Sequence, residues 1–382
     1  MIKLNVISHS FPTHSTIDFV FVEQLCKKLA DNDIQITIIA PQSITKCILR
    51  RIPSIPLKSR LLSTRGNEMI LYRPYWISLG RKFSSWNTYA FNFSVKLQLL
   101  KMKPNIDLFY CHFWAQAVAI YKYAIKYNIP IVVAAGEGHL TTHLKMNHKE
   151  ILTIKRAVKG VICVSSKSKT ESIAAGFTDG NNCQVIPNGV DMQLFKKHNC
   201  GDMRRKYNFP SDAFIIIFVG QFTQRKGVGQ LVNALVRLND DRIKVIFAGS
   251  GPEPPCYKNT IYQGTIPHNQ LPEYLSAADV FVLPTYNEGC SNAIIEAMAC
   301  GLPILSSDLD FNKDILNTSN SILFDPTNVD EIVFAIRRMM NDSRERERLA
   351  AGAILTAKSL DLNVRAKKIA NYLYQIVDQF HC

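Results

Sequence analysis

The sequence of 382 residues lacks the features that mark metal-binding, disulfide-linked and membrane-spanning chains. It has ten cysteines, but no two of them have Cys-x-x-Cys spacing, so neither a zinc site nor a disulfide framework can be read from them. Its longest hydrophobic runs, such as AFIIIFVG at residues 213–220, fall short of the roughly 18 residues that span a bilayer. The opening MIKLNVISHSF lacks the extended hydrophobic segment of a secretory signal. These absences predict a globular protein of the cytoplasm.

Acidic residues are scarce in the first half of the chain. Residues 1–190 carry 24 Lys and Arg against 10 Asp and Glu, whereas residues 191–382 carry 21 against 21, so the first half holds the whole net charge of +14. Such a charge favours an anionic partner, whether nucleic acid, a lipid surface or a phosphate-bearing substrate.

The densest basic part, residues 44–65, is predicted to be a basic and partly apolar surface loop. It contains no nucleic-acid module and no stacking aromatics, so a membrane surface is favoured over nucleic acid; an ordinary solvated loop is an equal alternative. Its six basic residues are Lys46, Arg50, Arg51, Lys58, Arg60 and Arg65.

Short β-rich runs alternate with longer amphipathic segments along the whole chain, which predicts βα units with parallel sheets. The length suits two domains. The turn residues of IPNGVDMQLF lie near the middle, so we predict doubly wound domains over residues 1–190 and 191–362. The segment 363–382 is predicted to be a helix that crosses back to the N-terminal domain.

Ligands of doubly wound sheets bind at the carboxyl ends of the strands, and the second half has suitable groups at three such ends. After FIIIFVG, Arg225 and Lys226 are predicted to begin a helix, where they could hold a diphosphate or equally be solvated. After IKVIFAG, Gly249 and Gly251 allow backbone to approach a flat ligand closely. The convergence of three ends indicates one binding site.

The third strand end is EGCSNAIIEAMACG at residues 288–301. A helix starting near Ser291 would place Asn292 and Glu296 on one face, with Glu288 in the preceding loop. Free N–H groups at a helix N-terminus suit phosphate, and carboxylates accept hydrogen bonds from hydroxyls. The segment therefore predicts a nucleotide-sugar site; the alternative is an ordinary strand, loop and helix with solvated glutamates.

With these motifs the chain resembles the retaining glycosyltransferases of family 4, of the bacterial surface-polysaccharide type. The resemblance covers nearly the full length and implies the α/β fold called GT-B, two facing Rossmann-like doubly wound domains with a cleft between them. The motifs that carry it are IPNGVD, RKG at 225–227, AGSGP at 248–252, AADVFVLPT at 277–285 and EGCSNAIIEAMACGLP at 288–303.

The resemblance also implies residue roles. Lys226 would contact the donor phosphates, Glu288 and the amides from Gly289 onward would hold the sugar and diphosphate, and Glu296 would bind the ribose. His112, at the end of DLFYCHF, would face the donor sugar and the acceptor, or it is a core histidine. The catalytic candidates are thus Lys226, Glu288 and His112, and the donor-binding candidates are Gly220, Gln221, Arg225, Gly249, Gly251, Thr265, Ile266, Gly289, Cys290, Ser291, Asn292 and Glu296.

Three departures from the family pattern concern the leaving group and the acceptor. Gln221 stands where the family commonly has an arginine, so Arg225 is a candidate substitute. The first loop, SHSFPTHSTIDF, is not glycine-rich. GEGHL at 136–140 replaces a more polar loop and gives Glu137 and His139 as acceptor-binding candidates.

The predicted function is transfer of a sugar from a nucleotide-sugar donor, a UDP-sugar foremost, to a glycan or lipid-linked acceptor. No metal and no cofactor is expected, because Asp308-Leu309-Asp310 and Asp31-Asn32-Asp33 are interpreted as loop acids. The expected partners are the donor, the acceptor and an anionic surface at the inner membrane face, without nucleic acid. The alternatives are a nucleotide-sugar epimerase of the same architecture and a non-catalytic sugar-nucleotide-binding protein of a polysaccharide assembly complex.

Overall fold

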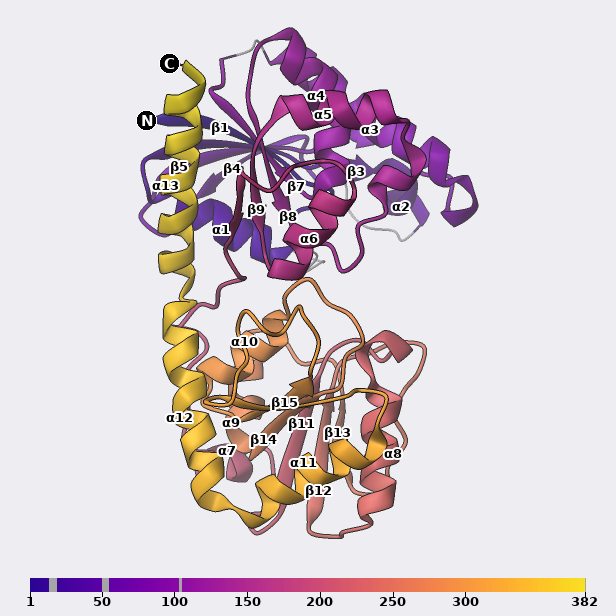
Figure 1. Cartoon of the computed structure of the whole chain (residues 1–382), viewed down its shortest axis with the longest axis vertical. Coiled ribbons are helices and arrows are strands. Elements are labelled where there is room, and N and C mark those ends of the chain that lie inside the picture. The colour runs from indigo at the N-terminus through magenta and orange to yellow at the C-terminus, as the bar shows by residue number, and fades with distance from the viewer. Residues whose placement is uncertain (14–18, 50–54, 103–104, 382) are drawn as a thin grey trace. The chain divides into compact units, whose positions relative to one another are not determined.

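The computed structural model describes residues 1–13, 19–49, 55–102 and 105–381. The chain forms two compact units (Figure 1). The N-terminal unit comprises residues 1–164, 168–186 and the chain from Ala366 onward, and the C-terminal unit comprises Ser165–Lys167 and Pro187–Arg365. In the described ranges, no helix combines the length and the hydrophobicity needed to cross a membrane.

The N-terminal unit is built on an eight-stranded sheet in the order β10-β9-β8-β7-β1-β2-β5-β4. All neighbouring strands are parallel except β4, which pairs antiparallel with β5 at the edge. The strands are β1 (Ile2–Ile7), β2 (Ile34–Ile39), β4 (Lys58–Leu62), β5 (Glu68–Tyr72), β7 (Leu108–His112), β8 (Ile131–Ala135), β9 (Val158–Cys163) and β10 (Cys183–Val185), with a small separate pair β3 (Gln42–Ser43) and β6 (Tyr75–Trp76).

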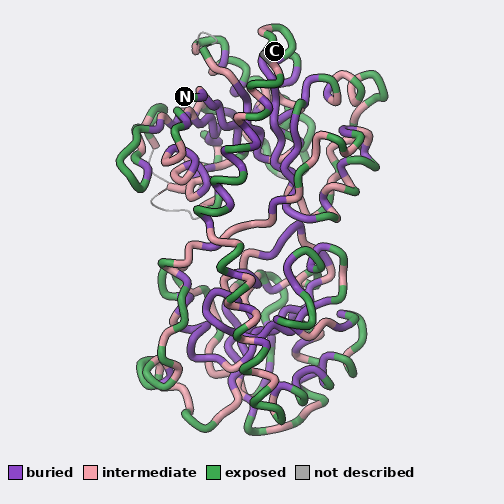
Figure 2. The backbone as a smooth tube through the Cα atoms, turned by 60° about the vertical axis from the view of Figure 1, so that its left-hand side comes forward, coloured by how far each residue is buried: buried purple, intermediate pink, exposed green. Residues whose placement is uncertain are grey.

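Helices cover both faces of this sheet, because its central strands are apolar on both sides. Leu108 and Tyr110 of β7 pack in the core with α1 and α13, whereas Phe109 and Cys111 pack in the core with α3, α4 and α5. Figure 2 shows the buried stretches of the chain, in purple, inside the unit. The helices are α1 (Val20–Ala30), α2 (Ile44–Leu49), η1 (Arg81–Phe83), α3 (Ser84–Lys101), α4 (Trp114–Lys126), η2 (Thr142–Lys145), α5 (His148–Ala157), α6 (Ser166–Ala174) and α13 (Leu362–His381).

The prediction that residues 44–65 form a loop is wrong for most of the residues that the structure describes, although residues 55–57 and 63–65 do lie in loops. Residues 44–49 form α2, and residues 58–62 form the edge strand β4. In β4, Arg60 pairs with Glu68 of β5 at 3.1 Å. Charged side chains are common on edge strands because they hinder pairing with other chains, so a high basic content here accompanies a strand. Arg50, Arg51 and Pro53 lie outside the described residues.

The C-terminal unit has a six-stranded parallel sheet in the order β13-β12-β11-β14-β15-β16. Numbered from its first strand this is 3-2-1-4-5-6, the order of dinucleotide-binding Rossmann folds. The strands are β11 (Phe214–Val219), β12 (Ile243–Ala248), β13 (Thr260–Gly264), β14 (Val280–Leu283), β15 (Ile304–Ser307) and β16 (Ser321–Phe324). The helices are α7 (Cys200–Lys206), η3 (Gln224–Lys226), α8 (Val228–Leu238), α9 (Leu271–Ala277), α10 (Asn292–Ala299), α11 (Val329–Asn341) and α12 (Ser343–Ser359).

The last helix, α13, carries an apolar face into the N-terminal unit. Ile369, Leu373 and Ile376 are buried in the same core as β1, β2 and α1. Tyr372 donates a hydrogen bond from its hydroxyl to the carbonyl of Asn182 at 2.5 Å. The spacing of these residues at three or four positions places them on one side of the helix.

Candidate active site

The strand order of the C-terminal unit brings the ends of β11 and β14 side by side at the point where the chain reverses its direction across the sheet. Crevices form at such switch points, outside the carboxyl ends of the strands. Lys226 follows β11 and Glu288 follows β14, and the Lys226 Nζ lies 2.5 Å from the Glu288 Oε1. Both side chains are largely buried, with 13% and 12% exposure. The two residues thus form a shielded ion pair.

Arg225 belongs to the same cluster. Its Nη1 lies 2.9 Å from the Glu288 Oε1 and donates a hydrogen bond to the carbonyl of Asn287 at 2.7 Å. Gln221, by contrast, lies just after the end of β11 and is exposed. One carboxylate therefore faces two cations, and the cluster keeps a net positive charge, which suits an anionic ligand. The structure brings Arg225 beside Lys226, and Gln221 adds no charge.

A sharp turn holds Lys226 beside the β14 loop. Gly227 has a φ of 69°, and a Cβ there would lie 1.9 Å from the carbonyl oxygen of Pro284, so only glycine fits. Thr285 connects the loops that follow β11 and β14, because its hydroxyl contacts the carbonyl of Arg225 at 3.1 Å and the carboxylate of Glu288 at 3.2 Å. Arg225 and Lys226 were predicted to begin a helix; they lie in the short η3, and α8 begins two residues later at Val228.

The loop before α10 and the first residue of this helix contain buried polar atoms without hydrogen-bond partners. Within the described residues these are Asn287 Nδ2, Ser291 Oγ and Asn292 Oδ1. Ser291 is the N-cap residue of α10, and its side chain makes no cap hydrogen bond. Buried polar groups are nearly always paired, and leaving one unpaired costs about 1–3 kcal/mol, so a cluster of three favours a polar ligand at this loop. The amides from Gly289 onward lie in the same segment.

A second carboxylate of the site lies one helical turn further on. Glu296 of α10 shares a face with Asn292, and its Oε1 lies 3.0 Å from His268 Nε2. The hydrogen bond that His268 donates to the Glu296 carboxylate raises the pKa of His268 above its ordinary value, against the opposing effect of burial. His268 is not among the site residues predicted from the sequence. It follows β13 closely, so the rule that ligand groups lie at carboxyl ends of strands could have found it.

The loops after β12 and β13 complete this edge of the sheet. A Cβ on Gly249 would lie 1.9 Å from the carbonyl oxygen of Gly220, and a Cβ on Gly251 would lie 2.3 Å from that of Phe222. These glycines therefore let the β11 and β12 loops pack against each other. Thr265 and Ile266 follow β13, and the Thr265 carbonyl accepts a hydrogen bond from the Tyr262 hydroxyl at 3.0 Å.

The turn IPNG at residues 186–189 supports the loop that follows β14. The Asn188 side chain donates a hydrogen bond to the carbonyl of Cys290 at 3.0 Å, and the Arg365 Nε donates one to the carbonyl of Pro187 at 2.7 Å. Burial raises the pKa of Cys290 to about 11, so this thiol stays protonated at neutral pH. The motif residues that are distant in sequence thus form one supported loop.

In the N-terminal unit, His112 ends β7 at the corresponding switch point beside β1. It is buried, and its ring lies 4.6 Å from that of Phe113 and 5.1 Å from that of Phe21. Phe113 has a φ of 86°, which a bulky side chain rarely adopts. Such backbone conformations cluster at functional sites, which supports a role for this turn.

Glu137 holds the same turn in place. Its carboxylate accepts hydrogen bonds from the backbone N–H of Trp114 at 2.8 Å and of Gly136 at 3.0 Å. Burial raises the pKa of Glu137, although these hydrogen bonds lower it. Both oxygens are engaged within the unit, so Glu137 fixes the start of α4 next to His112. His139 is exposed two residues away.

A cavity of about 200 Å³ lies at the carboxyl ends of β1, β2 and β5, and none of its lining residues is among the site residues predicted from the sequence. His9, Lys46 and Arg73 line it. The Arg73 guanidinium is buried and donates to the carbonyl of Pro12 at 2.7 Å, and burial lowers its pKa. The basic residues and their positions at strand ends could have revealed this cavity from the sequence.

The aspartates of the two Asp-x-Asp segments contact side chains of the protein. Asp308 and Asp310 both pair with Lys313, at 3.5 and 3.4 Å. Asp31 accepts a hydrogen bond from the hydroxyl of Ser63 at 2.5 Å. Over the residues that the structure describes, no cluster of three His, Cys, Asp or Glu side chains has the arrangement of a metal site.

Two family models match the chain almost end to end. The model described as Glycosyltransferase Family 4 matches residues 19–194, and the one described as Glycosyl transferases group 1 matches residues 201–355. With the paired Rossmann-type sheets and the carboxylates and cations at the β11–β14 switch point, they define the class: the chain belongs to glycosyltransferase family 4.

Individual relatives agree with this assignment. The chain is 25% identical over 94% of both chains to a putative teichuronic acid biosynthesis glycosyltransferase, TuaC, of Bacillus subtilis. It is 25% identical, over 65% of its own length and 70% of the relative, to an Escherichia coli UDP-Gal:alpha-D-GlcNAc-diphosphoundecaprenol alpha-1,3-galactosyltransferase.

Solved structures confirm the fold class, GT-B. Sucrose-phosphate synthase from Thermosynechococcus elongatus matches 99% of this chain and 100% of its own with a TM-score of 0.80 at 19% identity. Anabaena HepE in complex with UDP-glucose matches 98% and 100% with a TM-score of 0.71 at 17% identity.

Proposed function

We propose that this glycosyltransferase moves a sugar from a UDP-sugar donor to a glycan or lipid-linked acceptor in surface polysaccharide synthesis, with retention of the anomeric configuration. The observation that carries the proposal is the Lys226–Arg225–Glu288 cluster at the β11–β14 switch point. It is supported by a HepE structure that contains UDP-glucose and by a relative named for an undecaprenol-linked acceptor.

The chemistry follows from where charge develops. When the bond between the anomeric carbon and the phosphate oxygen breaks, its electron pair leaves with the diphosphate, and positive charge grows on the sugar ring. Lys226 and Arg225 stabilise the diphosphate, and Glu288 keeps both cations at this point. The acceptor hydroxyl then attacks from the same face and passes its proton to the departing phosphate oxygen. This route needs no metal and no cofactor.

The remaining residues divide between the donor and the acceptor. Glu296 binds the ribose hydroxyls, with His268 fixing its carboxylate. The unpartnered polar groups of Asn287, Ser291 and Asn292 form hydrogen bonds with the bound nucleotide sugar. In the N-terminal unit, His112 acts at the sugar, with Glu137 as a positioning residue and His139 and the cavity around Arg73 contacting the acceptor.

The test is donor binding followed by transfer. A thermal-shift panel of UDP-, GDP-, ADP- and dTDP-sugars should show stabilisation by a UDP-sugar, lost in Glu296→Ala. NMR of the product formed with a lipid-diphosphate-linked sugar should show the donor's anomeric configuration, with or without EDTA. An inverted product, or activity that EDTA removes, would overturn the mechanism.

The two alternatives give different results. An epimerase would convert the donor sugar without acceptor, so an epimer in that control would favour it. A non-catalytic protein would bind the donor without transfer or hydrolysis; the replacement of the usual arginine by Gln221 is the observation in its favour.

We also propose that the protein works at the cytoplasmic membrane face as a peripheral protein. The excess of basic residues in residues 1–190 supports an anionic partner, and the relative with an undecaprenol-linked acceptor supports a lipid one.

A further inference from the structure

Helix α3 carries a row of exposed apolar side chains that the fold does not use. The row, called here the α3 stripe, has a spacing of three or four residues, so its members lie along one side of the helix. Trp86 is 45% exposed, Tyr89 is 62% exposed and Phe93 is 48% exposed. The stripe consists of Trp86, Tyr89, Phe93, Leu97 and Leu100.

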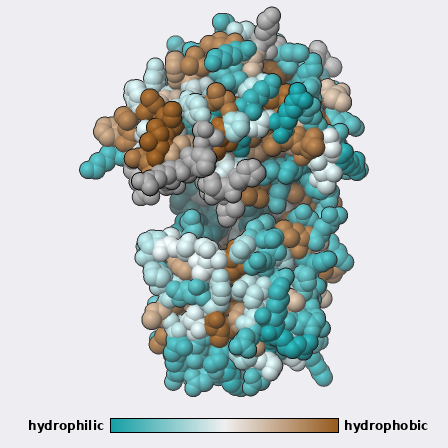
Figure 3. All heavy atoms as spheres, turned by 180° about the vertical axis from the view of Figure 1, so that it is seen from behind, coloured by the Kyte–Doolittle hydropathy of each residue, from teal (hydrophilic) through white to brown (hydrophobic). Residues whose placement is uncertain are grey.

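The same helix already packs on the sheet through another side. Phe91, Val95 and Leu99 are buried in the core with α4 and the strands. A surface helix normally has one apolar side, so a second one indicates an apolar partner outside the unit. Figure 3 shows hydrophobic side chains gathered on the N-terminal unit, on the side where α2 and α3 lie.

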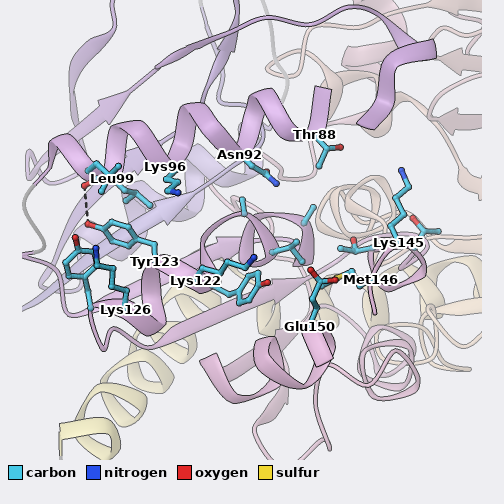
Figure 4. A pocket seen from close by; sticks show the side chains of 18 residues that line it. Thr88, Asn92, Lys96, Leu99, Lys122, Tyr123, Lys126, Lys145, Met146 and Glu150 are labelled. Atoms are coloured by element: carbon cyan, nitrogen blue, oxygen red, sulfur yellow. Dashed lines mark hydrogen bonds between the residues drawn. The ribbon is translucent and has the colours of Figure 1, made fainter. Parts of the chain in front are cut away.

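A pocket of about 690 Å³ lies next to the stripe, between α3, α4 and the segment η2–α5 (Figure 4). Its lining includes the apolar side chains of Leu99, Val118 and Met146. The size suits a small amphiphilic molecule. We call it the α3–α4 pocket. Leu100 belongs to both the stripe and the pocket, so the two apolar surfaces are continuous.

Four lysines surround this pocket against one carboxylate. The carboxylate, Glu150, is occupied by the cap of its own helix, because it accepts a hydrogen bond from the backbone N–H of Asn147 at 3.2 Å. Within the described part of the chain, none of these four lysines forms an ion pair. They come from three elements and are Lys96, Lys122, Lys126 and Lys145.

We propose that this face of the N-terminal unit docks on the surface of an anionic lipid bilayer. The α3 stripe enters the interfacial layer, and the α3–α4 pocket takes the anionic headgroup and upper chain of one lipid. Trp and Tyr side chains favour the level of the headgroups, and lysines near an anionic surface bind it electrostatically. The inference specifies where the membrane association proposed above occurs, and it does not depend on the transferase chemistry.

Charge distinguishes the bilayer from a second copy of the chain. A twofold contact through the stripe would bring the same four lysines of two copies toward each other, and like charges repel. An anionic surface instead pairs with all four. The patch is therefore complementary to a lipid surface rather than to itself.

The chain contains its own reporter for this surface. Of its three tryptophans, Trp76 and Trp114 are buried, whereas Trp86 lies in the stripe. Vesicles of phosphatidylglycerol and phosphatidylcholine should shift the tryptophan emission to the blue, and brominated lipids should quench it. Trp86→Phe should lose this response. An unchanged emission with vesicles would overturn the insertion of the stripe.

Vesicle cosedimentation with matched variants tests both parts of the surface. Phe93→Ser/Leu97→Ser should weaken binding to phosphatidylglycerol vesicles by about tenfold or more, because the variant lacks two apolar side chains that leave water when the stripe enters the bilayer. Lys122→Glu/Lys126→Glu should weaken it by at least about tenfold, and the wild-type affinity should fall with salt.

Controls in the C-terminal unit have the same chemistry. Phe334→Ser/Leu355→Ser removes two apolar side chains that are more exposed than Phe93 and Leu97, and Arg337→Glu/Lys358→Glu reverses two exposed charges. Both should bind vesicles as the wild type does. Equal losses in the controls and the test variants would overturn the proposed location.

The pocket has a test of its own. Dihexanoyl phosphatidylglycerol below its micelle concentration should raise the melting temperature of the wild type and of Phe93→Ser/Leu97→Ser, but not that of Lys122→Glu/Lys126→Glu. Absence of any effect would overturn the lipid site in the pocket. A lipid-free dimer that Phe93→Ser/Leu97→Ser dissociates in sedimentation velocity would assign the stripe to a second copy and overturn the bilayer proposal.

Discussion

Both units are built on doubly wound, mainly parallel sheets, of eight strands in the N-terminal unit and six in the C-terminal unit, and they differ in what they expose. Among the residues that the structure describes, 20 of the exposed large hydrophobic side chains belong to the N-terminal unit and 4 to the C-terminal unit, although the units are of similar size. The excess charge is divided in the same way, because residues 191–382 are neutral overall. Two domains of Rossmann architecture can therefore have surfaces of different chemical character.

The comparison assigns different chemistry to the two units. The C-terminal unit places its charged groups at one edge of the sheet, where Lys226, Arg225 and Glu288 meet. The N-terminal unit distributes lysines and apolar side chains over α3 and α4. A small polar ligand suits the first arrangement, and an extended anionic surface suits the second.

The largest expected effect is the loss of transfer in Lys226→Ala. A charge-assisted hydrogen bond contributes about 1.5–3 kcal/mol, so turnover should fall roughly ten- to a hundredfold if the contact forms in the transition state. Vesicle binding should be unchanged, which separates the functions of the two units. Lys313→Ala, whose lysine is exposed and pairs with loop acids, is the matched control. Near-normal turnover in purified Lys226→Ala would remove this residue from the reaction.

Gly227→Ala should disrupt the donor-side turn itself. The left-handed conformation costs an alanine about 1–2 kcal/mol, and its Cβ would collide with the carbonyl of Pro284. Thermal unfolding should occur at lower temperature, and donor affinity should fall because Lys226 moves away from Glu288. In Gly229→Ala, two residues further on, a Cβ meets nothing within 4 Å, so stability should stay the same or rise. Equal melting temperatures for both variants would contradict the geometry.

The pair of His268 and Glu296 predicts a pH dependence confined to the C-terminal unit. The folded-state pKa of His268 is raised above 6.5, so the stabilisation from this pair is full below that pH and is lost as pH rises through the folded pKa. The melting temperature of wild type should therefore exceed that of His268→Gln most at low pH, and the difference should shrink toward alkaline pH. A difference that grows with pH would reverse the assigned sign.

The smallest expected effect is a gain from Gln221→Arg. The side chain is exposed at the end of β11, so an arginine there adds a cation near the cluster without disturbing packing. Donor affinity, measured by calorimetry, should rise a few-fold, since exposed charges are screened by solvent. In Arg225→Gln/Gln221→Arg the gain should offset the loss of Arg225. A loss of affinity in Gln221→Arg would show that Arg225 already fills this role.

Much of the candidate site could be predicted because its residues follow strands that the sequence makes evident. The runs around β11, β12 and β14 are apolar and short, and the rule that ligands bind at carboxyl ends then selects Lys226, Gly249 and Glu288. The weaker strand β13 was missed, and His268 was missed with it. Its burial pattern shows why, because no residue of TIYQG is fully buried and the run lacks strong apolar character.

By itself, the sequence determined the alternation of strands and helices, the family and the unequal charge of the two halves. These depend on local periodicity, on contiguous motifs and on composition, which need no knowledge of contacts. Only the tertiary structure decided that Arg225 shares a carboxylate with Lys226, that Glu137 caps the turn beside His112, and that residues 58–62 form an edge strand. Those facts depend on pairs of residues far apart in the chain, and their distances are set by packing.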